Sequence, residues 1–408
     1  MSWAMRSNYK PIGDYIRLVD ERNKELKVST LLGLSISKEF IPSVANTVGT
    51  NMRNYKIIRK NQFACSIMQV RRDGKMPVAL LEDIEEAIIS QAYPVFEIID
   101  TEVLSPQYLM MWFTRSEFDR QATFHAVGGV RGSLEWEDFL AFELPVPSIE
   151  QQREIVREYN VIKNRIALNQ QLNKKLEETA QALYRHWFVD FEFPNEEEKP
   201  YKSSGGKMVY NDELDKEIPE GWLSGSFENH IKIKMGQSPK GNTYNQEGVG
   251  TPLINGPVEF GEFFTEKTKW TSAPTKLCEK GDLIVCVRGS TTGRYVKSDD
   301  VYCLGRGVCS FKGLKSQRFI DELFKSNLDK LLTYTTGSTF PNWDRQTLLD
   351  FPSIVPPNEV ILKFHKMTNT LFSLVETKAK ANKKLIKFQT LLFSRMARVE
   401  SEEEIVNH

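Results

Sequence analysis

Two short glycine-containing loops carry arginine side chains in a setting that suits contact with nucleic acid. They are Arg71-Arg72-Asp73-Gly74-Lys75 and Arg288-Gly289-Ser290-Thr291-Thr292-Gly293-Arg294. Each follows an apolar run that predicts a strand, Ile67–Val70 and Leu283–Val287. An arginine guanidinium can bridge O6 and N7 of guanine, and hydroxyl and loop N–H groups suit phosphate oxygens. Either loop alone could be a solvated hairpin turn, but their matching places in the two halves of the chain favour a binding function.

Other polar loop residues are weaker candidates for the same contacts. The full set of candidate DNA-binding residues is Arg71, Arg72, Lys75, Arg131, Gln237, Ser238, Lys240, Arg288, Ser290, Thr292, Arg294, Arg306, Ser338 and Asn342. We interpret His125, His186 and His230 as structural, because none of the five histidines lies in a metal-ligand pattern.

Motifs for catalysis are missing from the sequence. Gly74-Lys75 and Gly206-Lys207 lack the upstream glycine and the hydroxyl residue of a phosphate-binding loop. There is no HExxH, and no Asp/Asn-Pro-Pro-Tyr/Phe tetrapeptide of the kind that amino-methyltransferases use. The five cysteines, Cys65, Cys278, Cys286, Cys303 and Cys309, form no CxxC pair. We interpret them as buried thiols in a reducing cytosol and expect no metal.

Composition is that of an ordinary globular protein. The 408 residues include 54 basic and 54 acidic side chains, so the formal net charge is zero. This balance argues against a lone nucleic-acid binder but allows basic loops, or a partner that supplies phosphate contacts. The N-terminal segment has no apolar core for a signal peptide, and no run of residues is long and apolar enough to cross a membrane. We therefore expect a cytoplasmic protein.

An internal repeat divides the chain into two similar parts. Asn173-Lys174-Lys175-Leu176 returns as Asn382-Lys383-Lys384-Leu385, at an offset of 382 − 173 = 209. The same offset aligns Val146-Pro147 with Val355-Pro356. The repeat predicts two units of similar size with a shared frame.

The repeated frame contains two long helical arms. Apolar residues in the first arm alternate at spacings of four and three from Ile155 to Trp187, which is a heptad seam. Such a helix of roughly 40 residues is about 60 Å long. Asn173 and Asn382 lie on the seam, where they either fix the register of the two arms or face solvent. The predicted arm-packing residues are Ile155, Ile162, Asn173, Leu176, Leu183, Leu371, Asn382, Leu385 and Leu392.

Within the globular parts we expect short strands and one long helix per repeat. In the first part, strands at 56–58 and 63–67 enclose a polar turn, and one helix opens at Pro106 and runs to Phe124. In the second part, 276–286 mirrors that strand–turn–strand, and a helix begins near Phe319. The expected boundaries are a first domain at 1–147, an arm at 148–190, a connector at 191–218, a second domain at 219–356, an arm at 357–400 and a tail at 401–408.

The chain resembles the specificity subunit of type I restriction–modification systems. The segments that carry the resemblance are GGVRGSLEWEDF, GSTFPNWDRQTLLDF, GDLIVCVRGSTTGR and the arm LNQQLNKKLEETAQALYRHWFVDFEFP. The resemblance implies an α+β protein with two target-recognition domains, each a small mixed β-sheet with helices, related by a pseudo-two-fold. Each domain would read one half of a split DNA sequence. The two arms would form an antiparallel coiled coil that sets the spacer.

The same resemblance implies partners but no active site and no cofactor for this chain. Two modification subunits would bind S-adenosylmethionine and methylate adenine in double-stranded DNA, and motor-nuclease restriction subunits would use Mg and ATP. The second arm begins PPNEVILKF and lacks the Glu-Gln-Gln of the first, which puts equal docking at both arms in doubt. Two alternatives remain: a stand-alone methyltransferase or nuclease, and a helical adaptor with no role on DNA.

Overall fold

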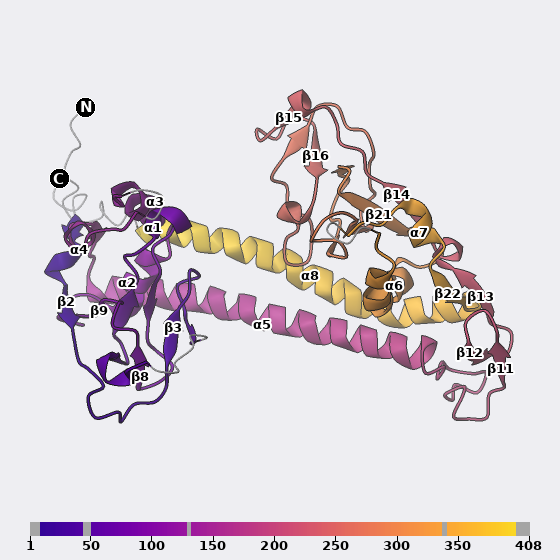
Figure 1. The fold of residues 1–408 in the computed structure, drawn as a ribbon, viewed down its shortest axis with the longest axis horizontal. Coiled ribbons are helices and arrows are strands. Elements are labelled where there is room, and N and C mark those ends of the chain that lie inside the picture. The colour runs from indigo at the N-terminus through magenta and orange to yellow at the C-terminus, as the bar shows by residue number, and fades with distance from the viewer. Residues whose placement is uncertain (1–8, 44–49, 129–131, 337–340, 397–408) are drawn as a thin grey trace. The chain divides into compact units, whose positions relative to one another are not determined.

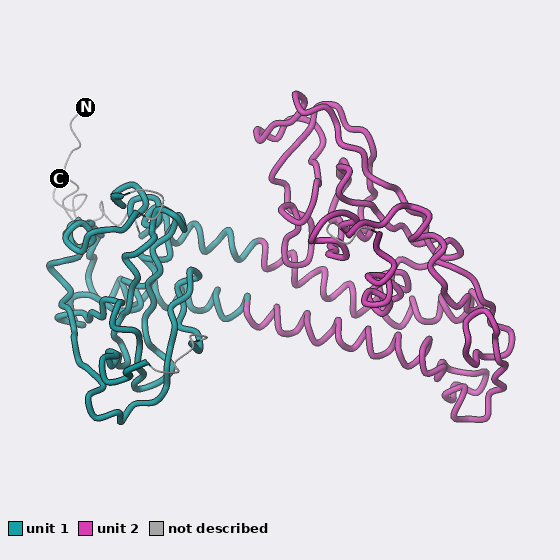
Figure 2. The backbone as a smooth tube through the Cα atoms, viewed as in Figure 1, with its two compact units in different colours: residues 1–166, 384–408 teal, residues 167–383 magenta. Residues whose placement is uncertain are grey.

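The computed structural model of the chain describes residues 9–43, 50–128, 132–336 and 341–396. It separates into two compact units (Figure 2): unit 1 contains residues 1–166 and 384–408, and unit 2 contains residues 167–383. Each unit combines a sheet-containing domain with segments of two long helices, α5 (Ile149–Phe188) and α8 (Asn358–Met396) (Figure 1). The mixed fold and the two long helices expected from the sequence are therefore present.

The sheet of unit 1 has four antiparallel strands. Their order is β2 (Ile16–Val19), β9 (Val95–Ile98), β6 (Phe63–Cys65) and β7 (Val78–Leu80). The rings of Phe63 and Phe96 stack across β6 and β9 with centroids 5.0 Å apart. Both are fully buried, so the centre of this sheet faces the core. Two smaller pairs flank it, β3 (Leu32–Leu34) with β4 (Phe40–Pro42) and β5 (Lys56–Arg59) with β8 (Glu86–Ile89).

Three local expectations for unit 1 are wrong. β5 and β6 do not form a hairpin, because β5 pairs with β8 while β6 pairs with β7 and β9. The expected strand at Ile67–Val70 is absent, and Val70 instead begins the short helix α1 (Val70–Asp73). The expected single helix at 106–124 is two helices, α2 (Pro106–Phe113) and α3 (Ser116–His125), because Arg115 adopts an extended conformation between them.

Unit 2 contains a sheet of the same topology. Its order is β14 (Ile231–Met235), β21 (Val308–Gly313), β18 (Leu283–Cys286) and β19 (Tyr295–Lys297). The helix α6 (Gln317–Thr333) packs on β21. The expected hairpin over 276–286 is wrong, since only β18 is a strand there and Leu277 forms an isolated bridge to Cys303.

The remaining strands and 3-10 turns lie outside the two four-stranded sheets described above. A second four-stranded sheet in unit 2 has the order β15 (Tyr244–Asn245), β17 (Trp270–Thr271), β16 (Thr251–Ile254) and β20 (Cys303–Leu304). The connector forms a hairpin of β11 (Met208–Asn211) and β12 (Lys216–Pro219). The 3-10 turns are η1 (Ile12–Asp14), η2 (Met52–Asn54), η3 (Phe227–Asn229), η4 (Gly241–Thr243) and η5 (Pro257–Glu259).

In each domain, the first strand pairs with the last strand. β1 (Tyr9–Pro11) pairs with β10 (Glu143–Pro145), and β13 (Leu223–Ser226) pairs with β22 (Pro352–Val355). The short helices before the closing strands, α4 (Trp136–Leu140) and α7 (Arg345–Leu349), lie at the repeat offset, since 345 − 136 = 209. The repeat found in the sequence is therefore a repeat of structure.

The two long helices pack antiparallel to each other within each unit. In unit 1, the Tyr159 and Phe393 rings lie 5.6 Å apart, and in unit 2 the Trp187 and Phe364 rings lie 5.8 Å apart. Of the predicted seam residues, Ile155, Asn173 and Asn382 are buried, and the half-buried ones are Ile162, Leu176, Leu183, Leu371, Leu385 and Leu392.

All five cysteines are free and buried. Burial raises the pKa of the Cys278 and Cys286 thiols to about 11 each, so their reactive thiolate forms are scarce at neutral pH. Within the described ranges, no helix could cross a membrane, and no group of metal-ligating side chains gathers in one place.

Candidate nucleic-acid interface

The arginine loop of unit 2, residues 288–294, is joined by backbone hydrogen bonds to the segment that precedes α7. Gly289 N donates to Pro341 O at 2.9 Å, and Trp343 N donates to Val287 O at 3.0 Å. Trp343 is buried, and its indole N–H donates to Leu331 O at 3.0 Å, which anchors this segment to α6. Arg288 also forms a bridge with Asn342. Two of the predicted site residues, 54 positions apart (342 − 288), thus become neighbours.

The loop is compact, and some of its polar groups are used internally. The Thr292 hydroxyl lies 2.8 Å from Gly289 O and 2.9 Å from Pro341 O, so it holds the turn in place. Gly293 has a φ of +92°, and a Cβ there would lie 3.2 Å from both Leu328 and Leu332, so a larger residue would be strained. The side chains that remain exposed are those of Arg288, Ser290 and Arg294.

A third segment joins the same surface of unit 2. Arg306 N donates to Ser238 Oγ at 3.2 Å, and Val287 N donates to Gly307 O at 2.9 Å. The backbones cross closely here, because a Cβ on Gly236 would lie only 2.1 Å from Gly305 O. The loop that holds Arg306 therefore lies between the loop of Ser238 and the loop of Arg288. Gln237, Lys240 and Arg306 are exposed on these segments, while Ser238 and Asn342 are half-buried.

Unit 1 has the same kind of backbone hydrogen bonds between different residues. Arg71 N donates to Gly132 O at 3.1 Å, and Leu134 N donates to Ile67 O at 2.9 Å. Val127 and Ser133 exchange two backbone hydrogen bonds of 2.9 Å. Their counterparts at the repeat offset in unit 2, Thr336 and Asn342, do the same at 3.0 and 3.1 Å (336 − 127 = 342 − 133 = 209). In both units, a basic segment thus lies against the loop that leads into a short helix, α4 in unit 1 and α7 in unit 2.

The basic side chains of unit 1 lie on α1 and directly after its C-cap, Gly74, rather than in a hairpin loop. Arg71, Arg72 and Lys75 are exposed. Arg72 Nε lies 2.6 Å from Asp73 Oδ1, and this hydrogen bond lowers the pKa of the Asp73 carboxyl. The charge of Arg72 is therefore partly balanced, while Arg71 and Lys75 add positive charge to the surface. Two further predicted residues, Arg131 and Ser338, lie outside the described residues.

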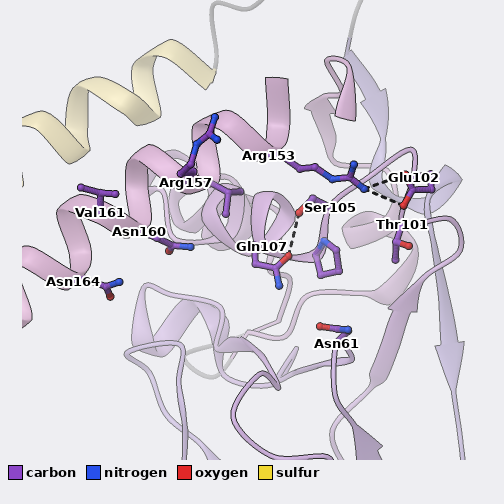
Figure 3. Close-up of a pocket in the computed structure, with 12 residues that line it drawn as sticks. Asn61, Thr101, Glu102, Ser105, Gln107, Arg153, Arg157, Asn160, Val161 and Asn164 are labelled. Carbon is purple, nitrogen blue, oxygen red and sulfur yellow. Dashed lines mark hydrogen bonds and ion pairs between the residues drawn. The ribbon is translucent and has the colours of Figure 1, made fainter. Parts of the chain in front are cut away.

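A polar cavity of about 550 Å³ lies in unit 1 beside the start of α5 (Figure 3). Arg153 reaches Glu102 with both N–O distances at 3.0 Å, and Asn160 and Asn164 project from later turns of the helix. Arg157 lines the same cavity. The cavity offers guanidinium and amide groups, which suit acidic or polar protein groups.

The Gln residue that distinguishes the start of the first arm is a core residue. Gln152 is fully buried; it accepts from Ser105 N at 2.9 Å and donates to Val103 O and Pro147 O at 2.9 and 2.8 Å. Its counterpart at the repeat offset is Ile361, which is also buried. The difference between the arms at this position is therefore a change of internal bonding, with no surface group lost.

An apolar groove of about 640 Å³ runs between α5 and α8 in unit 1. Val161, Phe388 and Leu391 line it and are 65%, 55% and 62% exposed. An ion pair of Glu158 with Arg395, at 3.2 Å, flanks it. All three apolar residues lie outside the predicted heptad seam, and exposed apolar residues at such positions are the sequence signal for this groove.

Comparison with known proteins connects these features to one family. Residues 38–178 match the family described as type I restriction modification DNA specificity domain. The chain is 26% identical over 286 residues to a Methanocaldococcus jannaschii protein named as a type I restriction enzyme MjaX specificity subunit, covering 69% of this chain and 64% of that protein. It therefore spans less than two thirds of that relative. It is 24% identical over 315 residues to the MjaIX specificity subunit of the same organism, covering 73% of this chain and 70% of that protein.

The fold has a counterpart among solved structures. The type I restriction–modification S subunit of M. genitalium matches with a TM-score of 0.54 at 14% identity, over 97% of this chain and 98% of that one. This likeness is one of fold. Over residues 38–178 the chain thus resembles the type I restriction modification DNA specificity domain, and over more than two thirds of its length it is similar to type I restriction specificity subunits.

Proposed function

We propose that this chain is the non-catalytic DNA-recognition subunit of a type I restriction–modification complex. Each globular domain reads one half of a bipartite target in double-stranded DNA. The observation that carries this proposal is a duplicated set of backbone hydrogen bonds. They join a basic segment to the loop before a short helix, at Arg71 with Gly132 before α4 and at Gly289 with Pro341 before α7. We call each of these DNA-recognition domains a reader. Two readers, each attached to the same repeated pair of long helices, suit a target with two separate half-sites.

The exposed arginine and lysine side chains of each reader can make two kinds of contact with DNA, to bases and to phosphates. In unit 2, Arg288 and Arg306 belong to neighbouring segments, so both guanidinium groups can approach one stretch of duplex. Arginine suits bidentate contact with guanine, while Lys240 and the loop hydroxyls suit phosphate oxygens. Because the formal net charge is zero, we infer that partner subunits supply much of the remaining positive surface around the duplex.

The helical arms set the spacer and dock two modification subunits. The groove lined by Val161, Phe388 and Leu391 supports this docking, because exposed apolar side chains in a row between two helices suit a further helix. Motor-nuclease restriction subunits complete the restricting complex. S-adenosylmethionine, Mg and ATP belong to these partners, this chain has no active site of its own, and the complex is cytoplasmic.

Methylation mapping tests the proposal directly. The chain is combined with its modification subunits, and methylated adenines are mapped on a DNA library with randomised positions. We expect one bipartite motif, with methylation that requires both the chain and the modification subunits. Methylation by the purified chain alone would establish an enzyme, and methylation independent of the chain would favour an adaptor with no role on DNA.

A further inference from the structure

A buried ion pair lies beneath the basic segment of unit 1. Asp119, on α3, is 9% exposed, and its Oδ1 lies 2.8 Å from Lys38 Nζ. The same oxygen accepts a hydrogen bond from Met76 N at 3.1 Å. Met76 is fully buried and directly follows Lys75. One carboxylate therefore connects the turn between β3 and β4 to the end of the Arg71–Lys75 segment.

The position of Lys38 is conformationally and electrostatically unfavourable by itself. Its backbone has a φ of +65°, which residues other than glycine rarely adopt. Its ammonium group also donates to Phe113 O and lies 5.0 Å from the centre of the Phe118 ring. Burial lowers the pKa of the Lys38 amine, and the contact with Asp119 opposes that effect. An unpaired charge in a buried site would be destabilising, and the contact between Lys38 and Asp119 supplies each with a partner of opposite charge.

The basic segment is thus held at both ends. Arg71 N is bonded to Gly132 O at 3.1 Å, and Met76 N is bonded to Asp119 Oδ1 at 3.1 Å. Without the second bond, the backbone between Asp73 and Met76 would lose its hydrogen bond to α3, and Gly74, which lacks a side chain and has open space around it, would let the backbone at Lys75 reorient. The direction of Lys75 would then no longer be fixed, and the segment that carries Arg71 would be held only by the bond of Arg71 N to Gly132 O.

The repeat supplies an independent argument. The counterpart of Asp119 in unit 2 is Leu328, since 328 − 119 = 209. A Cβ on Gly293 would lie 3.2 Å from Leu328 Cδ1, so Leu328 lies directly against the arginine loop of unit 2. The same helical position therefore supports the basic segment in both units, through an apolar contact in one and an ion-paired hydrogen bond in the other.

We propose that Lys38 and Asp119 are positioning residues, which fix the Arg71–Lys75 segment and thereby set the base preference of the first reader. This inference rests on the proposed function. It assigns specificity to two side chains that are themselves too deeply buried to touch DNA.

Two double variants test the inference in the complex with modification subunits. K38M/D119L replaces the pair by apolar side chains, avoids an unpaired charge, and removes the acceptor for Met76 N–H. K38M/D119N also removes both charges but keeps an acceptor oxygen. The control is K60M/E85Q, which removes the exposed Lys60–Glu85 pair of the same unit. For each variant, base preference at both half-sites is measured by methylation of randomised targets, and folding by thermal unfolding.

We expect K38M/D119L to lower base discrimination at one half-site by about tenfold, the size of one lost directional contact. The other half-site should keep its preference, and K38M/D119N should fall between K38M/D119L and the wild type. Equal loss at both half-sites, or loss that follows only the folded fraction, would overturn the inference in favour of a purely structural pair. If K38M/D119L fails to fold, an unchanged preference in K38M/D119N overturns it. A wild-type complex without a bipartite motif would refute the proposed function instead.

Discussion

Asn169 Nδ2 donates a hydrogen bond to Asn382 Oδ1 at 2.7 Å, and both amides are buried between α5 and α8 in unit 2. Asn382 was expected on the seam, but with Asn173 as the matching residue of the first arm. Asn173 is also buried, and its Oδ1 lacks a hydrogen-bond partner among the described residues. A polar pair inside an apolar seam penalises sliding, because any shift buries both amides without partners.

Removing one member of this pair should destabilise the helices more than removing both. N382L leaves the Asn169 amide buried without this partner, which we expect to cost about 1–3 kcal/mol of unfolding free energy. The double variant N169L/N382L should recover part of that loss. Urea unfolding of the two single variants and the double variant measures the coupling, with N160L at an exposed position of α5 as the control. Additive losses would show that the hydrogen bond contributes nothing specific.

The arginines of the second reader should affect one half-site only. Replacing Arg288 and Arg294, both exposed on the loop after β18, removes two candidate base contacts. Each bidentate contact is worth about 1–3 kcal/mol, so R288A/R294A should lose at least tenfold in discrimination at its half-site. Methylation mapping reports both half-sites in one experiment, and K202A in the connector serves as the control. Relaxation of both halves together would count against independent readers.

Lengthening the arms should change the spacer and leave the half-sites unchanged. Because the helices are antiparallel within each unit, one heptad is inserted into each, after Ile166 and before Lys384. Seven residues add about 10.5 Å of helix. The duplex rises about 3.4 Å per base pair, so the spacer should grow by about three base pairs. Methylation mapping gives the spacer length, and an unchanged spacer would refute the idea that the arms act as a ruler.

Charged residues in the apolar groove should weaken the binding of modification subunits. F388D/L391D places two carboxylates where a partner helix would bury apolar surface, and we expect affinity to fall by at least tenfold. Both positions are more than half exposed, so the chain itself should remain folded. Isothermal titration with the modification subunit measures the effect. L18D, at a leucine that is 55% exposed on β2, is the matched control; an equal loss there would remove the argument for the groove.

Acid should destabilise unit 2 through His230. Its ring is 3% exposed, and its Nε2–H donates to Ile354 O at 2.8 Å. Burial lowers the pKa of His230 by more than the hydrogen bond to Ile354 O raises it, and nearby Lys315 lowers the pKa slightly further. The unfolded chain therefore takes up the proton first as pH falls. The stability from the neutral ring is present above the unfolded pKa of about 6.5 and is lost below it.

Urea unfolding between pH 7.5 and pH 5 measures this effect. The wild type should lose up to about 1.4 kcal/mol per pH unit more than H230Q, whose amide can still donate to Ile354 O. H186Q, at an exposed position, is the control and should follow the wild type. Identical pH profiles for H230Q and the wild type would assign the acid sensitivity to other groups.

The sequence predicted the repeated frame well because the frame is built from local patterns. The heptad spacing from Ile155 to Trp187 needs only neighbouring residues on one helix to be visible. The offset of 209 also applies to elements that were not used to find it, such as the bridges of Val127 with Ser133 and Thr336 with Asn342.

Strand pairing and the composition of the site could not be read in the same way. Lys56–Arg59 and Phe63–Cys65 have the local appearance of a hairpin, but each pairs with strands further along the chain. Long-range pairing of this kind depends on the whole core, which short patterns do not describe. For the same reason, the closeness of Ser238, Arg306 and Arg288 was not visible, since backbone hydrogen bonds between distant segments create it.

The paired closing strands have a consequence for how such genes change. The first and last strands of each domain lie side by side, β1 with β10 and β13 with β22. A coding segment exchanged by recombination between these two points would replace an entire reader and leave both long helices untouched. New DNA targets could therefore arise in a single step, by substitution of a whole cassette instead of many successive point mutations.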